Sequence, residues 1–206
     1  MSSSVSAVIF DLDGTLTGTP NPWRYIHERL GLWDTGASTH MEDWLSGRST
    51  YDEFCRRDVQ LWAGRNLSEI QTYLDEITVN PHLPQVVDSL TGCGIPSIII
   101  SSGFRYVARK IQKNCNWDRL MIYANELLAG PEVRIEVSAD WASPISKKAH
   151  ADAALAIVGA SRQDTLVVSD SEHDLEQLRE CGFHLHVRED DDLLRVLPFL
   201  GYSEGK

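Results

Sequence analysis

Two acidic residues stand two positions apart where an apolar run ends in a glycine turn. The run Ala7–Phe10 leads directly into Asp11, Leu12, Asp13 and Gly14. Because side chains alternate along a strand, Asp11 and Asp13 are expected to point the same way unless the turn redirects the second. Two neighbouring carboxylates repel each other unless a cation lies between them. The pair therefore predicts a cation site, although a capped turn would use the same residue types.

Hydroxyl and basic side chains follow at two more positions that suit the binding of an anion. The run Ile98–Ile100 leads into Ser101 and Ser102, with a helix predicted close behind them. Hydroxyls and the backbone amides of a helix start can bind phosphate oxygens. Lys147 and Lys148 open another predicted helix. Either lysine can bring a fixed positive charge to a phosphoryl group.

A third apolar run also ends in an acid. Thr165–Val168 leads into Ser169 and Asp170, and Asp174 follows one helical turn later. Taken one at a time, such serines cap helices, such acids charge helix starts and lysines are solvated. Here all of them stand near predicted strand ends, which is where open α/β sheets bind their ligands. Their combination favours chemistry on a phosphate group.

The elements that would position these residues alternate between strand and helix. Four short apolar runs and two weaker segments predict strands: Ala7–Phe10, Pro96–Ile100, Leu120–Ala124, Glu132–Val137, Thr165–Val168 and Phe183–Val187. Helical patterns lie between them: Pro84–Thr91, Tyr106–Asn114, Lys147–Val158 and Asp174–Cys181. The acidic run Glu189–Asp192 is expected to start a last helix. This order predicts an α/β fold with a Rossmann-like parallel sheet flanked by helices.

One segment breaks the alternation. From about Pro22 to Glu76 the sequence shows only helical patterns, at Trp23–Leu30, Met41–Leu45, Tyr51–Trp62 and Ser68–Ile77. Prolines stand at both ends of this segment. We predict a core domain of residues 1–16 and 84–206 and a small all-helical cap domain of residues 17–83. Most aromatic residues of the cap are expected to form its own core, with one or two facing the cleft.

Composition narrows the range of partners. The chain has 206 residues and a formal net charge of −11, with no basic stripe that would bind nucleic acid. The longest apolar stretch, near Ile95–Ile100, is too short to cross a bilayer. The four cysteines are widely spaced and nothing marks a signal peptide, so we expect reduced thiols in a cytoplasmic protein. The sequence does not indicate the oligomeric state.

These motifs give the chain a resemblance to a known superfamily. It resembles the haloacid dehalogenase-like (HAD) phosphatases, and among them the phosphoserine phosphatase-like branch, over nearly its whole length. The stretch from Asp11 to Thr15 matches the first motif, Ser101 to Gly103 the second, and Ser169 to Asp174 the fourth. Members of this branch also carry a helical cap between the first and second motifs. The strandless insert falls at that place.

The resemblance implies a role for each acid. Asp11 would attack phosphorus, and Asp13 would protonate the leaving alcohol and then activate water. Asp11, the backbone carbonyl of Asp13 and Asp170 would hold Mg²⁺, with Asp174 completing or supporting the shell. His173 stands where the family usually has asparagine, and it is expected to take over that supporting role. Its titration would then make the activity more sensitive to pH.

The resemblance also implies the phosphate-binding groups. Ser101, the Ser102 amide and Lys147 would neutralise charge on the transferring phosphoryl group. Lys147 keeps the spacing to Asp170 that is usual in phosphoserine phosphatases, whereas Lys148 is the alternative. The ligand is expected to be a small phosphate ester, because a small cap suits small molecules.

The cap departs from the phosphoserine phosphatase pattern. An alignment without gaps places Pro20 where the family has a glutamate that binds the amine of the substrate. Asp58 stands where the family has an arginine that binds the carboxylate of the substrate. Tyr51 stands nearby, at a position where the family has an aromatic residue. Arg56 or Arg57 would fill the arginine's place only after a shift in register. Tyr51, Asp58 and Arg57 are therefore the candidates for substrate specificity, and phosphoserine is expected to be a poor substrate.

The predicted function is a Mg²⁺-dependent phosphomonoester hydrolase with an aspartyl-phosphate intermediate on Asp11. A phosphotransferase would use the same residues, and a true phosphoserine phosphatase with altered cap contacts is a further alternative. A carbon–halogen hydrolase needs neither Asp13 nor a metal. A phospho-accepting receiver domain lacks an inserted cap, and a catalytically dead binding module would have lost a motif residue. The last three fit the sequence less well.

Overall fold

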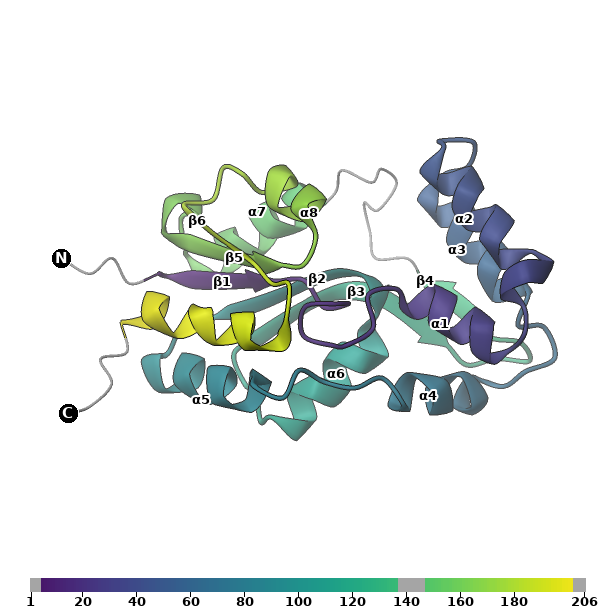
Figure 1. The fold of residues 1–206 in the computed structure, drawn as a ribbon, viewed down its shortest axis with the longest axis horizontal. Coiled ribbons are helices and arrows are strands. Elements are labelled where there is room, and N and C mark those ends of the chain that lie inside the picture. The colour runs from purple at the N-terminus through teal and green to yellow at the C-terminus, as the bar shows by residue number, and fades with distance from the viewer. Residues whose placement is uncertain (1–4, 137–146, 202–206) are drawn as a thin grey trace.

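The computed structural model describes residues 5–136 and 147–201. A six-stranded sheet in the order β4-β3-β2-β1-β5-β6 forms its centre (Figure 1). The parallel strands are β1 (Ala7–Phe10), β2 (Ser97–Phe104), β3 (Leu120–Leu128), β5 (Thr165–Ser169) and β6 (Phe183–His186). The short β4 (Arg134–Glu136) pairs antiparallel with β3. This arrangement confirms the predicted α/β fold.

The central strands are apolar because helices cover both of their faces. Every residue of β1 and β5 is buried, which is typical of parallel strands. Helices α5 (Leu83–Cys93) and α6 (Arg105–Asn114) and the 3-10 helix η3 (Asp190–Leu200) cover one face. Helices α7 (Lys147–Val158) and α8 (Glu172–Gln177) cover the other (Figure 1). A 3-10 turn, η2 (Arg162–Asp164), precedes β5.

Several predicted bounds are corrected by the structure. Strand β2 extends to Phe104, so Ser101 and Ser102 belong to the end of the strand and not to a loop behind it. Helix α8 begins two residues earlier than predicted, because the Ser171 side chain caps it by accepting from the Asp174 amide at 3.4 Å. The last helix is of the 3-10 type, with Pro198 inside it. Val137, predicted as a strand end, lies outside the described residues.

The predicted strandless insert consists of helices joined by short turns and loops. It contains α1 (Pro22–Arg29), the 3-10 turn η1 (Trp33–Thr35), α2 (Ala37–Leu45), α3 (Tyr51–Gln60) and α4 (Leu67–Asp75). Asn21, Thr50 and Asn66 cap α1, α3 and α4 with their side-chain oxygens, which is where polar cap residues are favoured. These helices lie beyond one end of the sheet, whereas the start of β1 and the end of η3 lie near the opposite end (Figure 1).

The two connections to this insert run side by side. Thr17 bridges Val79, and the Gly18 amide donates to the Thr78 carbonyl at 3.0 Å. A side chain at Gly18 would press on the Thr78 hydroxyl at 2.6 Å, so glycine permits this close approach. Because the chain enters and leaves the helical insert at one place, we propose residues 17–83 as a cap domain and residues 1–16 and 84–206 as the core.

Within the described ranges, no helix is long and apolar enough to span a bilayer. All four cysteines are free thiols, of which Cys55 and Cys181 are buried, Cys93 is exposed and Cys115 is partly exposed.

Candidate active site

A buried lysine joins two of the predicted acids at the carboxyl end of the sheet. The Nζ atom of Lys147 donates to Asp11 Oδ1 at 2.7 Å and also pairs with Asp174. Ser169 adds a hydrogen bond from its hydroxyl to Asp174 at 3.2 Å. The Lys147 side chain is only 8% exposed, so this charge acts with little screening by water. Lys148 points elsewhere and pairs with Glu180 at 2.6 Å.

Asp13 has a different set of neighbours from Asp11. The Ser101 hydroxyl donates to Asp13 Oδ2 at 2.6 Å, and the Gly103 amide donates to Ser101 Oγ at 2.8 Å. A side chain at Gly103 would collide with the Asp13 carboxylate, so only glycine allows this approach. The second carboxylate oxygen, Asp13 Oδ1, is buried and has no hydrogen-bond partner among the described residues. Such an atom costs free energy unless a proton, a ligand or a cation satisfies it.

Asp170 is held against the turn that follows β1. Thr15 Oγ1 donates to Asp170 Oδ1 at 3.0 Å and accepts from the Asp170 amide at 2.8 Å. Gly14 adopts a left-handed φ of 87°, and a side chain there would collide with the Asp170 carboxylate. The turn therefore needs glycine both for its backbone and for the close approach of Asp170.

Burial changes the protonation of the two neighbouring acids. Burial raises the pKa of Asp11 to about 7, although the charge of Lys147 opposes the rise. Burial and then the charge of Asp11 raise the pKa of Asp13 to about 8. The pKa of Lys147 is raised, because its attraction to Asp11 and Asp174 outweighs the lowering caused by burial. Burial therefore favours the protonated form of both acids, and only Asp11 has a lysine beside it that favours its charged form.

The acids do not form a ready-made metal cage. No group of three or more histidine, cysteine, aspartate or glutamate side chains within residues 5–136 and 147–201 is arranged to hold a metal ion. A Mg²⁺ site needs less than this, since one or two carboxylates, a carbonyl and waters suffice. Asp170 lies near enough to raise the pKa values of both Asp11 and Asp13. With the unpartnered oxygen of Asp13, this crowding of hard oxygen donors fits a small divalent cation.

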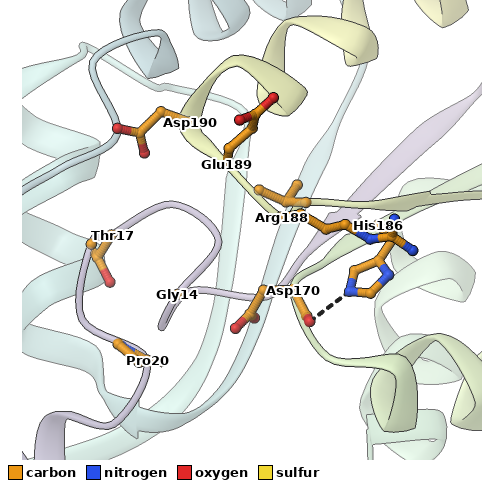
Figure 2. A pocket seen from close by; sticks show the side chains of 10 residues that line it. Gly14, Thr17, Pro20, Asp170, His186, Arg188, Glu189 and Asp190 are labelled. Carbon is orange, nitrogen blue, oxygen red and sulfur yellow. Dashed lines mark hydrogen bonds between the residues drawn. The ribbon is translucent and has the colours of Figure 1, made fainter.

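An open cleft of about 410 Å³ adjoins Asp170. Figure 2 shows the turn containing Gly14 and the connection through Thr17 and Pro20 on one side and the chain from His186 to Asp190 on the other. His186 Nε2 bonds the backbone carbonyl of Asp170 at 2.8 Å, which ties the cleft wall to the end of β5.

A comparison with protein families identifies the family of the chain. Residues 8–179 match the model of the haloacid dehalogenase-like hydrolase family. This range contains the predicted site residues Asp11, Asp13, Ser101, Ser102, Lys147, Asp170 and Asp174. The chain belongs to the haloacid dehalogenase-like hydrolase family. The resemblance stated from its motifs is thus confirmed, and the chain is an enzyme of the hydrolase class.

The individual proteins that resemble this hydrolase share little sequence identity with it. A phosphoserine phosphatase of Idiomarina loihiensis is 26% identical over 129 residues, which cover 62% of this chain and 56% of the relative. The matched part therefore spans little more than half the length of that protein. Among solved structures, a phospho-aspartyl intermediate analogue of phosphoserine phosphatase has a TM-score of 0.72 at 18% identity, covering 93% of this chain and 90% of that one.

Two further structures give the same picture. A substrate-bound phosphoserine phosphatase complex has a TM-score of 0.71 at 17% identity, covering 94% of the hydrolase and 99% of that chain. A HAD family hydrolase from Salmonella enterica serovar Typhi has a TM-score of 0.72 at 18% identity, with 87% and 61% of the two chains covered. At these identities the likeness establishes a shared fold.

The predicted specificity residues of the hydrolase do not stand free over the acids. Asp58 is fully buried and bonds His27 Nε2 at 3.0 Å and His40 Nδ1 at 2.7 Å. Arg57 pairs with Asp43 at 2.9 Å, in the contact between α2 and α3. The expectation that Asp58 contacts the substrate and sets its specificity is therefore corrected, because its carboxylate bonds two histidines inside the insert.

Tyr51, the third candidate, is also buried, but it reaches the second motif. Its hydroxyl donates to the Ser102 carbonyl at 2.5 Å. The same carbonyl accepts from Trp23 Nε1 at 3.2 Å and from Asn125 Nδ2 at 2.8 Å. Helical residues of the insert thus contact the backbone of the predicted phosphate-binding segment and not open space. The ring centroids of Trp23 and Phe104 lie 4.6 Å apart, so aromatic packing accompanies these hydrogen bonds.

Some residues at the site escaped the sequence analysis. Thr15 was seen only as part of a motif, yet it makes both bonds to Asp170. Asn125 was missed, and the structure shows it fully buried within the mostly apolar strand β3, where a buried polar side chain is unusual. His173 was expected to support the acids, but it is exposed and bonds Gln177 Nε2 at 2.8 Å. Its place on the outer side of α8 explains the difference.

Proposed function

We propose that this hydrolase is a Mg²⁺-dependent phosphomonoesterase that acts on small phosphorylated metabolites through an aspartyl-phosphate on Asp11. The observation that carries the proposal is the contrast between two neighbouring acids. Lys147 pairs with Asp11 and favours its charged form, whereas the buried Asp13 accepts only the Ser101 hydroxyl among the described residues. One carboxylate is thus suited to attack and the other to transfer a proton.

In the first step an oxygen of Asp11 forms a bond to phosphorus, and the bond from phosphorus to the alcohol oxygen breaks. The proton of Asp13 goes to that oxygen, so the leaving group departs as a neutral alcohol. The pKa of Asp13, which burial raises to about 8, supports this role because the group holds a proton at neutral pH. A general acid works best when its pKa lies near the working pH.

In the second step water attacks the phosphorus of the aspartyl-phosphate. Asp13, now ionised, takes a proton from the water, and the bond between phosphorus and Asp11 breaks. Inorganic phosphate leaves and both acids return to their starting states. Ser101, the Ser102 amide and Lys147 would neutralise the charge on the phosphoryl oxygens in both steps.

The residues that would hold Mg²⁺ are Asp11, the backbone carbonyl of Asp13 and Asp170, with Asp174 in support. When bound, the ion supplies positive charge beside the phosphoryl oxygens and lowers the pKa of the nearby acids. Lys147 separates Asp174 from direct access to such an ion, since its ammonium lies between Asp11 and Asp174. We therefore assign Asp174 to the positioning of Lys147 and to the support of the metal ligands, and not to direct contact with the ion.

We propose further that phosphoserine is not the preferred substrate. The proposed cap contains six arginines and no lysine, and every one of these arginines pairs with an acidic side chain, as in Arg24–Glu28, Arg29–Glu76, Arg48–Asp43, Arg56–Asp52, Arg57–Asp43 and Arg65–Glu69. A free amino acid would need an uncommitted cation for its carboxylate. The names of the phosphoserine phosphatase relatives support the opposite assignment, so the substrate panel below decides between them.

The experiment is phosphate release from phosphoserine, sugar phosphates, polyol phosphates, nucleotides and p-nitrophenyl phosphate, with and without Mg²⁺. Asp11→Asn should abolish release from every ester. Asp118→Asn removes an exposed acid outside the site and serves as the matched control. Loss of a test ester without release of phosphate, in the presence of a second alcohol, would indicate a phosphotransferase. Full release in excess chelator would contradict the metal requirement.

A further inference from the structure

A single backbone carbonyl collects three hydrogen-bond donors from three separate elements. The Ser102 oxygen accepts from Trp23 of α1, Tyr51 of α3 and Asn125 of β3. Asn125 also donates to the Tyr51 hydroxyl at 2.7 Å, so the donors are ordered among themselves. A carbonyl has two lone pairs and usually accepts one or two bonds. Three buried donors on one oxygen fix its direction far more tightly than secondary structure requires.

The same peptide group faces the proposed catalytic residues on its other side. A peptide is planar, so fixing the Ser102 oxygen also fixes the direction of the Gly103 amide hydrogen. That hydrogen is donated to Ser101 Oγ, and the Ser101 hydroxyl is then free to donate to Asp13. The bonds thus run without a break from the helices of the insert to Asp13. Cooperative chains of this kind are stronger in a buried, low-dielectric setting.

We propose that Trp23, Tyr51 and Asn125 are positioning residues that hold the Ser101 hydroxyl and Asp13 in register through the Ser102–Gly103 peptide. Two of the three come from the proposed cap, so this part of the site is complete only when α1 and α3 are docked on the core. The expected effect on phosphate release rests on the proposed function. The expected position of the Ser102–Gly103 peptide rests on the hydrogen bonds alone. It accounts for the otherwise unexplained burial of the Tyr51 and Asn125 polar groups.

Conservative variants separate positioning from packing. Tyr51→Phe removes one hydroxyl, and Trp23→Phe keeps a ring against Phe104 while it removes the indole donor. Trp62→Phe is the matched control for the second, because Trp62 lies 5.9 Å from Trp23 in the same aromatic cluster and its Nε1 has no partner among the described residues. Tyr106→Phe is the control for the first.

The Tyr106 control tests whether any contact of the insert with the core would serve. The Tyr106 hydroxyl of α6 bonds Asp75 of α4 at 3.1 Å and does not touch Ser102. Loss of this bond weakens docking at another place without changing the Ser102 carbonyl. An effect shared by Tyr51→Phe and Tyr106→Phe would therefore reflect general loosening of the insert.

The kinetic readout is the single-turnover rate with p-nitrophenyl phosphate. We expect it to fall about tenfold in Tyr51→Phe and Trp23→Phe and about a hundredfold in the double variant, with KM changed less than about twofold. A loss in kcat alone is expected because Ser101 and Asp13 act on the reacting groups. The two controls should stay within about twofold of the parent enzyme. Equal losses in a variant and its control would overturn the proposal.

The structural readout does not need an active enzyme. Hydrogen exchange of the Gly103 amide should become about tenfold faster in Tyr51→Phe, with no change in Trp62→Phe or Tyr106→Phe. If the parent protein hydrolyses no phosphate ester, the proposed function fails while this measurement still tests the positioning. Unchanged Gly103 exchange in both Tyr51→Phe and Trp23→Phe would overturn the proposal even if the enzyme is active.

Discussion

Lys147 donates to Asp11 at 2.7 Å across a sequence separation of 136 residues. The strand β1 and the start of α7 are therefore brought together at the carboxyl end of the sheet, where both side chains are almost buried. A buried ion pair of this kind contributes little to stability but fixes a charge in place.

The first prediction concerns the choice between two adjacent lysines. Lys147→Met should lower kcat/KM for phosphate esters by a hundredfold or more, on the order of 3 kcal/mol of transition-state stabilisation. Lys148→Met is the matched control, because its side chain pairs with Glu180 at the surface. It should keep near-parental kinetics. The reverse ranking of the two variants would show that the lysine has been assigned wrongly.

The second prediction concerns the pH dependence of stability in the metal-free protein. Burial raises the pKa values of Asp11 and Asp13 from an ordinary 3.8 to about 7 and about 8, so folding favours their protonated forms. Their favourable contribution to the free energy of unfolding is complete below about pH 4, and it is lost as the pH rises through 7 to 8. Asparagine at position 13 does not ionise, so Asp13→Asn should avoid part of this loss of stability. The free energy of unfolding at pH 8 should rise by on the order of 2 kcal/mol.

Asp192→Asn provides the control of opposite sign. Hydrogen bonds from the Arg188 amide and the Arg195 side chain lower the pKa of Asp192, so its stabilisation is present at neutral pH and is lost on acidification. Denaturant melts from pH 4 to pH 9 measure both effects. A stability of the parent protein that does not fall between pH 5 and pH 8 would contradict the raised pKa values.

The third prediction concerns the metal. Chelation should abolish phosphate release and Mg²⁺ should restore it, and Asp170→Asn should raise the required Mg²⁺ concentration at least tenfold. Glu189→Gln removes an exposed acid that lines the same cleft and should leave that requirement unchanged (Figure 2). Isothermal titration with Mg²⁺ gives an independent measure of binding. Equal Mg²⁺ affinity in the parent and Asp170→Asn would remove Asp170 from the metal shell.

The fourth prediction concerns Asp58. Asp58→Asn should lower the free energy of unfolding by about 2 kcal/mol, because the carboxylate bridges His27 and His40 inside the insert. It should leave the ranking of substrates unchanged. Asp52→Asn, which removes an exposed acid paired with Arg56 on the same helix, should cost much less. A change in the order of preferred esters in Asp58→Asn would show that Asp58 does reach the substrate.

Much of the fold could be predicted because its signals are local. Buried parallel strands are apolar, and so are the runs Ala7–Phe10 and Thr165–Val168, apart from Thr165. Glycine or serine follows each run within a few residues. Asp11, Asp13 and Asp170 were found for the same reason, since each stands at a strand end. Topology alone then brings those ends together.

The contacts of the insert could not be predicted because they depend on how helices are rotated. A gapless alignment placed Asp58 toward the substrate, but its carboxylate turns inward to two histidines. The helical pattern of Tyr51 and Trp23 correctly indicated packing, yet it carries no information on which carbonyl their polar atoms reach. Asn125 acts through a partner more than twenty residues away in sequence, and no local pattern reports such a bond.

The most direct test of the account is to trap the covalent intermediate. The parent enzyme is mixed with a phosphate ester and Mg²⁺, quenched in acid during turnover and reduced with borohydride, which converts an aspartyl-phosphate to homoserine. Peptide mass spectrometry should find homoserine at position 11 in the parent protein, with unmodified aspartate at position 13 and no conversion in Asp11→Asn. Conversion at another acid, or robust turnover by Asp11→Asn, would contradict the account.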